Sequence, residues 1–82
     1  MITVEAREYD EALEAIDIDE AIEDAAKGCG RYISIEWGVN KPYSDLFGEE
    51  DYEWIPYGEA VITLKELNIS IDEVLCKLGE YL

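Results

Sequence analysis

The sequence predicts a single α+β domain: a small antiparallel sheet of three to four strands, with two to three helices packed on one face. The length of 82 residues allows one hydrophobic core, so the predicted domain spans residues 1–82. Apolar and polar residues alternate in residues 2–7 and 31–37, which is typical of half-buried strands. A further strand is expected at residues 60–64, antiparallel to residues 31–37.

Two apolar stripes, one in residues 9–16 and one in residues 18–25, predict a pair of short helices. The stripes are displaced by nine positions, about two and a half helical turns, so they would face opposite sides of one straight helix. We therefore expect a break near residues 17–19. Asp17 and Glu20 are spaced to form a capping box at the start of the second helix.

The C-terminal helix has the best-marked start, because Ser70 and Glu73 have the spacing of a capping box. Thr63 and Glu66 have the same spacing and predict one short turn before Asn68. The apolar stripe of the C-terminal helix consists of Ile71, Val74, Leu75 and Leu78, continued by Leu82.

Proline, glycine and turn-forming residues set the expected limits of the middle strands. Asn40, Lys41 and Pro42 are expected to end the strand that starts at residue 31, and Gly58 is expected to break the chain before the next strand. Residues 51–57 extend into a strand only at a sheet edge or a bulge, because Pro56 has no backbone N–H.

Charge is the outstanding global property, since 21 acids face six bases and give a net charge of −15 at pH 7. Nucleic acid and anionic lipid carry the same sign, so direct binding to either is not expected, whereas basic proteins and cations are attracted. Residues 1–26 hold ten acids and one base, net −9, and residues 45–59 hold six acids and no base, net −6. Charge that served only solubility, which is the alternative, has no reason to cluster in this way.

The second acidic block also contains four aromatic residues, and no other segment mixes charge and aromatic surface so densely. Aromatic residues are enriched among interface hot spots, while charge at the rim of an interface mainly speeds association. We expect a partner-binding surface formed by Asp45, Glu49, Glu50, Asp51, Tyr52, Glu53, Trp54 and Tyr57. The alternatives are a solvated loop for the acids and core packing for Tyr52 and Trp54.

Acids on the two N-terminal helices form a second candidate surface. Residues three or four apart on a helix are neighbours, so Glu20, Glu23 and Asp24 are expected to form one patch, and Glu11 and Glu14 another. Like charges in these positions cost stability, about 0.2–0.5 kcal/mol per pair. A chain that accepts this repulsion repeatedly is expected to present the charge to a partner.

No residue pattern predicts catalysis, and we do not expect an enzyme. The absence of histidine removes the commonest general base and the commonest metal ligand. The glycines lack the spacing of phosphate-binding loops. Residues 17–22 begin like a calcium-binding EF-hand loop, but Ala21 and Ile22 stand where an oxygen ligand and a glycine are required. We therefore expect no catalytic residue, no cofactor and no dedicated metal site.

Cys29 and Cys76 are far apart and in no metal-binding pattern. We expect two reduced, buried thiols, with a single disulfide as the alternative. The sequence shows neither a signal peptide nor an apolar run long enough to span a membrane. The cytoplasm is therefore the expected compartment, and a membrane is not an expected partner.

In charge, size and α+β content, the chain resembles the small acidic proteins that phages use to block CRISPR or restriction nucleases, several of which act as DNA mimics. It also resembles small acidic immunity proteins and antitoxins, which plug the basic active site of a nuclease. Neither resemblance involves a sequence motif, so no functional residue carries over. Both imply a protein–protein interaction with a basic partner, in the host cell cytoplasm if the chain is phage-encoded.

The clustered acidic blocks and the aromatic stretch predict an inhibitor that binds a basic nucleic-acid-handling protein or nuclease and competes with its nucleic acid. The first resemblance implies that this inhibitor is of the anti-CRISPR or DNA-mimic type. An immunity protein or antitoxin that blocks a nuclease toxin is one alternative. A non-inhibitory adaptor, in which the aromatic stretch forms a homodimer interface, is another. A metal-loaded acidic protein is the third.

Overall fold

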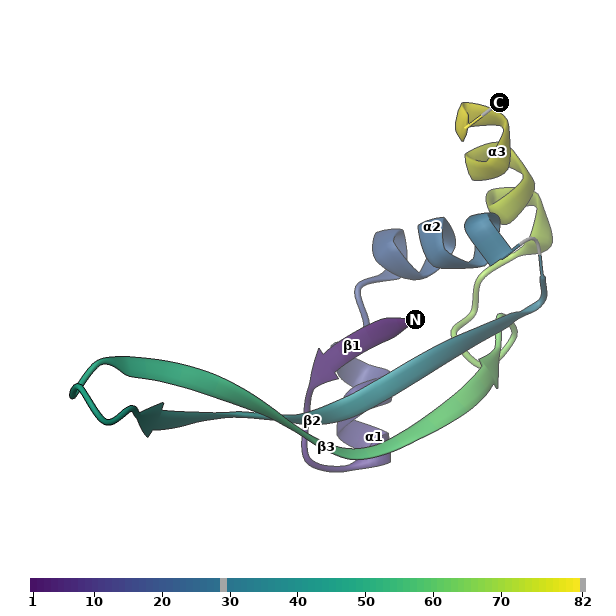
Figure 1. The fold of residues 1–82 in the computed structure, drawn as a ribbon. Helices are drawn as coiled ribbons and strands as arrows, with labels where there is room; N and C mark the ends of the chain where they lie inside the picture. The colour runs from purple at the N-terminus through teal and green to yellow at the C-terminus, as the bar shows by residue number, and fades with distance from the viewer. Residues whose placement is uncertain (29, 82) are drawn as a thin grey trace.

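Residues 1–28 and 30–81 are described by a computed structural model, and within them the chain forms three helices and three strands, which confirms the α+β class (Figure 1). Two sequence predictions, a buried thiol at Cys29 and Leu82 as the end of the apolar stripe, concern residues outside these ranges. The elements in chain order are β1 (Ile2–Glu5), α1 (Tyr9–Ala15), α2 (Ile18–Gly28), β2 (Tyr32–Ser44), β3 (Glu50–Thr63) and α3 (Ile71–Tyr81).

The strand order is β1-β2-β3, and β2 pairs with β3 in the expected antiparallel direction, with Ile33 opposite Ile62. However, β1 runs parallel to β2, with Ile2 opposite Ile35, so the sheet is mixed and not purely antiparallel. The reason is the helical connection between the two strands. Helices α1 and α2 return the chain to the end of the sheet where β1 began, which is how parallel neighbours are joined.

The buried side chains lie on one face of the sheet. In β1, Ile2 and Val4 are buried while Thr3 and Glu5 are exposed. Helices α1 and α2 cover this face, and α3 packs mainly on α2. The small side chains on α1 and α2 let the helices approach the sheet closely. Besides Ile2 and Val4, the buried core comprises Ala6, Ala12, Ile16, Ala21, Ala25, Ala26, Ile33, Ile35, Ile62, Leu64, Ile69 and Val74.

The start of α2 confirms the expected break between the two N-terminal helices. α1 ends at Ala15, and Oδ1 of Asp17 accepts hydrogen bonds from the backbone N–H of Asp19 at 2.9 Å and of Glu20 at 3.5 Å. These bonds satisfy two N–H groups that have no partner inside the helix. The charged cap therefore fixes where the chain turns from one helix into the next.

Helix α3 begins with the expected cap, since the backbone N–H of Glu73 donates to Oγ of Ser70 at 3.2 Å. Its apolar stripe is only partly covered, because Val74 is buried whereas Ile71 and Leu75 are 45% and 57% exposed. Cys76 is also exposed, which corrects the expected burial of that thiol. None of the helices in the described part of the chain is long and apolar enough to cross a membrane.

Candidate functional site

The hairpin of β2 and β3 continues well beyond the helices and forms a free-standing arm, defined here as residues 39–55 (left in Figure 1). Every residue from 40 to 53 is exposed. The arm gives the molecule a radius of gyration of 15.5 Å and a long axis of 50 Å. A compact domain of the same length would have a radius of gyration of about 12 Å.

The arm exists because both expected strand limits are wrong. β2 runs through Pro42 to Ser44, and β3 runs through Gly58 to Thr63. The pair that closes the hairpin is hydrogen-bonded, with the Asp45 N–H donating to the Glu49 carbonyl oxygen at 3.0 Å. Alternation along an antiparallel ladder then leaves Pro42 and Pro56 in positions that donate no bond between β2 and β3. A residue without an N–H is tolerated there.

The two strands of the arm direct alternate side chains to opposite sides. One side continues the uncovered sheet face and is called the open side; the other continues the helix-covered face and is called the helix side. The register places on the open side Asn40, Pro42, Ser44, Glu50, Tyr52 and Trp54. It places on the helix side Val39, Lys41, Tyr43, Asp51, Glu53 and Ile55.

The expected acidic cluster is therefore brought onto one arm but divided between its sides. Glu50 belongs to the open side, whereas Asp51 and Glu53 belong to the helix side. Lys41 lies directly opposite Glu53 and is the one base in residues 39–55, against five acids, which leaves a net charge of −4. The open side is the more aromatic, since it carries Tyr52, which is 69% exposed, and Trp54, whereas the helix side carries Tyr43.

Trp54 is half-buried and attaches the arm to the sheet. Its indole nitrogen Nε1 donates to Oε1 of Glu36 at 2.8 Å. Its ring lies over Gly38, where an added Cβ would be 2.9 Å from Cζ2 of Trp54 and 2.9 Å from Cα of Pro56. Trp54 therefore joins the two strands where the arm leaves the sheet, and only part of its surface is open to a partner.

A second tryptophan packs on the opposite face at the same level. The ring of Trp37 lies over Gly58 and meets the ring of Tyr9 edge-on, with 5.4 Å between centroids and an interplanar angle of 63°. Trp37 lies opposite Gly58 and Gly38 lies opposite Pro56, so Tyr57 is an extra residue without a cross-strand partner. Such a bulge bends the strand and increases its twist, which turns the arm relative to the sheet.

The tip of the arm contains two functional candidates that sequence reasoning missed. Leu46 and Phe47 occupy the centre of the turn and are 101% and 91% exposed. The Gly48 N–H donates to the Asp45 carbonyl oxygen at 3.2 Å, and Gly48 has φ = 78°, a left-handed conformation that glycine adopts without strain. An Asp followed three residues later by a Gly is the turn signal that predicts which two side chains point outward.

The acids of the two N-terminal helices lie on the body of the molecule, and several have structural partners. Glu23 forms a salt bridge with Nζ of Lys77 at 3.6 Å, and Asp24 with the N-terminal amine of Met1 at 3.4 Å. Glu11 accepts a hydrogen bond from the backbone N–H of Arg7 at 3.1 Å. The two ion pairs neutralise part of the expected patch, while Glu11, Glu14 and Glu20 remain exposed.

Lys77 on α3 contacts Glu23 on α2, and its acidic neighbours raise its pKa. It also contacts Oε2 of Glu80 at 3.2 Å. The hydrogen bond and the charge of Glu80, and the charge of Glu23, raise the pKa of Lys77 above its ordinary value of 10.5. The contact of Lys77 with Glu23 links α3 to α2, whereas its contact with Glu80 lies within α3.

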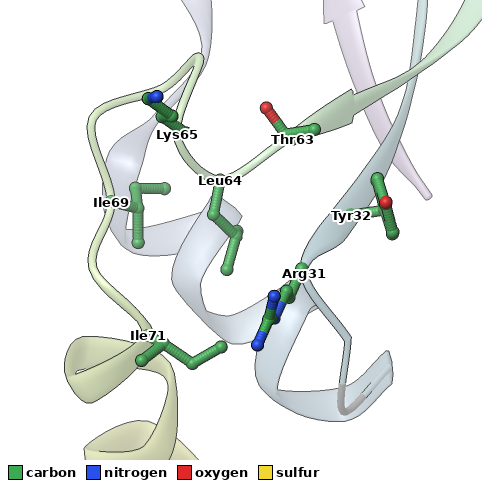
Figure 2. A pocket seen from close by; sticks show the side chains of 7 residues that line it. All are labelled: Arg31, Tyr32, Thr63, Leu64, Lys65, Ile69 and Ile71. Atoms are coloured by element: carbon green, nitrogen blue, oxygen red, sulfur yellow. The ribbon is translucent and has the colours of Figure 1, made fainter.

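A shallow pocket of about 360 Å³ lies at the opposite end of the hairpin from the tip (Figure 2). It combines an apolar wall with two bases, and its lining residues are Arg31, Tyr32, Thr63, Leu64, Lys65, Ile69 and Ile71. None of the residues predicted for partner binding lines it. No group of three or more metal-ligating side chains occurs in residues 1–28 and 30–81.

Comparisons with protein-family models, curated proteins and solved structures found no match to this chain.

Proposed function

We propose that the protein is an acidic inhibitor that places its arm in the nucleic-acid-binding cleft of a basic protein, such as a CRISPR or restriction nuclease, and competes there with nucleic acid. The observation that carries the proposal is the arm itself, a two-stranded ribbon that carries five acids and one base and whose residues 40–53 are all exposed.

The arm contributes little to the stability of the body. Two-stranded ribbons are marginally stable in water, and ordering each residue costs about 1–2 kcal/mol of backbone entropy. Residues 40–53 are all exposed and place no side chain in the core. Binding to a partner accounts for these exposed residues, whereas packing in the core does not.

The dimensions and charge of the arm suit a cleft that normally holds a nucleic acid strand or duplex. Two paired strands lie about 4.8 Å apart, so the ribbon is narrow. Proteins bind nucleic acid largely through Lys and Arg at the phosphates. The carboxylates on the two sides of the arm can bind the same Lys and Arg side chains, and aromatic side chains such as Tyr52 add contact area that excludes water.

An immunity protein or antitoxin that blocks a nuclease toxin fits the same surface and differs only in the partner. An adaptor is supported by a different observation, the exposed apolar surfaces away from the arm. Tyr32 and Val61 on the uncovered sheet face are 64% and 67% exposed. Sizing chromatography separates the adaptor from the inhibitor: a homodimer that dissociates on Val61→Asp, with the arm unaltered, favours the adaptor.

The experiment uses two variants of equal net charge. The arm-neutral variant carries Glu49→Gln, Glu50→Gln, Asp51→Asn and Glu53→Gln, and it keeps Asp45 because that side chain holds the turn. The helix-neutral variant replaces four exposed acids on the body. Its substitutions are Glu5→Gln, Glu8→Gln, Asp10→Asn and Asp72→Asn, none of which belongs to either candidate surface.

Immobilised wild-type protein is used to capture host proteins, and each captured protein is purified and tested for displacement of duplex or single-stranded nucleic acid. We expect a basic partner whose affinity falls steeply with salt. The arm-neutral variant should lose association rate and displacement, while the helix-neutral variant keeps most of both. Equal binding by wild type and the arm-neutral variant would exclude this function.

A further inference from the structure

We infer that Leu46 and Phe47, at the tip of the arm, insert into an apolar pocket on the partner protein whose rim is lined by Lys and Arg. The inference rests on the proposed function, because it concerns how the same arm holds its partner. It assigns to the tip a role that the acids cannot perform, since exposed charges mainly govern the rate of encounter.

The turn that carries these two side chains is held by a set of hydrogen bonds. Oδ1 of Asp45 accepts from the backbone N–H of Phe47 at 2.8 Å and of Glu49 at 2.9 Å. The Asp45 N–H and carbonyl oxygen make two further bonds across the turn, to Glu49 and from Gly48. The backbone of the tip is thus defined without any contribution from the side chains of Leu46 and Phe47.

Both apolar side chains point away from the protein. Their exposures of 101% and 91% are the two highest among the exposed large hydrophobic residues of the chain that are described. Turn positions are usually filled by Gly, Asn, Asp, Ser or Pro, which cost nothing when exposed to water. A leucine and a phenylalanine side by side in such a turn form an apolar surface that only a partner can cover.

A preorganised turn makes this apolar pair an effective anchor. Binding is weakened by the entropy lost when flexible side chains and loops become ordered, and a turn fixed before binding avoids much of that loss. Residues that fill a pocket at the centre of an interface carry most of its binding energy, and they act mainly on the dissociation rate. The tip has the shape and rigidity of such an anchor.

The acids beside the tip indicate that the partner's pocket has a basic rim. They also disfavour a second copy of this chain as the partner. The pair is flanked by Asp45 before it and by Glu49, Glu50 and Asp51 after it. Two copies meeting tip to tip would bring these carboxylates together, on molecules that each carry a net charge of −15. A partner pocket with Lys and Arg at its rim instead neutralises the acids while its apolar floor covers Phe47.

The test compares a tip variant, Leu46→Ala with Phe47→Ala, against a control, Val61→Ala with Leu75→Ala, which removes exposed apolar side chains elsewhere. The probe is the purified protein captured by wild type and displaced by nucleic acid. Binding kinetics are measured at several salt concentrations, alongside melting temperature.

We expect the tip variant to bind roughly 10–100-fold more weakly through faster dissociation, with an unchanged salt dependence and melting temperature. The control variant should bind like wild type. Wild-type affinity in the tip variant, combined with weak binding by the arm-neutral variant, would overturn the inference and leave the proposed function standing. Wild-type affinity in both variants would overturn both.

A photo-crosslinking residue in place of Phe47 identifies the occupant directly. We expect crosslinks to apolar residues of the captured protein that have Lys or Arg close by. Crosslinks to a second copy of this chain, or to a polar surface of the partner, would overturn the inference.

Discussion

Trp54 donates a hydrogen bond from Nε1 to the carboxylate of Glu36, with 2.8 Å between nitrogen and oxygen. The bond spans the end of the sheet and the start of the arm. It also provides Glu36 with a polar partner, although Glu59 lies directly opposite it on β3 with the same charge. Acids directly opposite each other destabilise a sheet, so the indole offsets a local cost.

Trp54→Phe is expected to lower the free energy of unfolding by about 1–2 kcal/mol, because it removes a hydrogen bond to a charged group that is partly shielded from water. Chemical denaturation measures the change. Glu36→Gln is the control, since it keeps an oxygen acceptor and removes the repulsion with Glu59, so its cost should be smaller. A larger loss in Glu36→Gln than in Trp54→Phe would show that the charge matters more than the indole.

Gly38→Ala is expected to destabilise the protein by about 1–3 kcal/mol or more, as overpacking typically does. The new methyl group would meet the Ile55 carbonyl oxygen and Cα of Pro56, which are backbone atoms that cannot move aside independently. Gly79→Ala on α3 is the matched control. Apart from the backbone of α3 itself, no atom of the described residues lies within 4 Å of its added Cβ, and alanine favours the helix, so we expect a gain of up to about 1 kcal/mol. Equal effects of the two substitutions would contradict the close packing at Gly38.

Added sodium chloride is expected to raise the melting temperature at pH 7, because it screens repulsion among acids that outnumber the bases 21 to six. If screening raises the free energy of unfolding by about 1 kcal/mol, the melting temperature of a domain of this size rises by about 4–8 °C. The arm-neutral variant should gain less from the same salt, since it carries four fewer acids. A melting temperature that stays constant or falls with salt would mean that pairing already offsets the repulsion.

Alkaline pH is expected to weaken the contact between α3 and α2. The pKa of Lys77 is raised in the folded state by Glu80 and Glu23, so its stabilising contribution is complete below its unfolded pKa and is lost as pH rises through the folded value. Wild type should lose more stability than Lys77→Met as the pH rises from below 10.5 through the higher pKa of the folded state. Tyrosine ionisation affects both proteins equally. Parallel loss of stability in the two would show that Lys77 is not the responsible group.

Much of the fold could be predicted because the determining signals are local. The capping residues at Asp17 and Ser70 mark helix starts by hydrogen bonds over two or three residues. Alternation in residues 31–37 indicates which side chains face the core, and Ile33 and Ile35 are indeed buried. Such patterns depend on helix and strand geometry alone.

The direction of β1 and the length of the arm depend on long-range pairing, which local patterns do not report. Pro42 and Gly58 were expected to end strands, yet Pro42 occupies a position where no cross-strand bond is donated, and Gly58 makes room for the ring of Trp37. The same limit applies to the candidate site. Acids adjacent in sequence were expected to act together, but pairing in a ribbon sends Glu50 and Asp51 to opposite sides.

We propose that the arm is the binding surface for a basic, nucleic-acid-handling protein. The decisive measurement is backbone amide hydrogen exchange of residues 40–53 in the free protein and in its complex with the captured partner. We predict that exchange in these amides slows on binding and is restored when nucleic acid displaces the protein. Unchanged exchange throughout the arm, in a complex that protects amides of the helices or the uncovered sheet face instead, would contradict the claim.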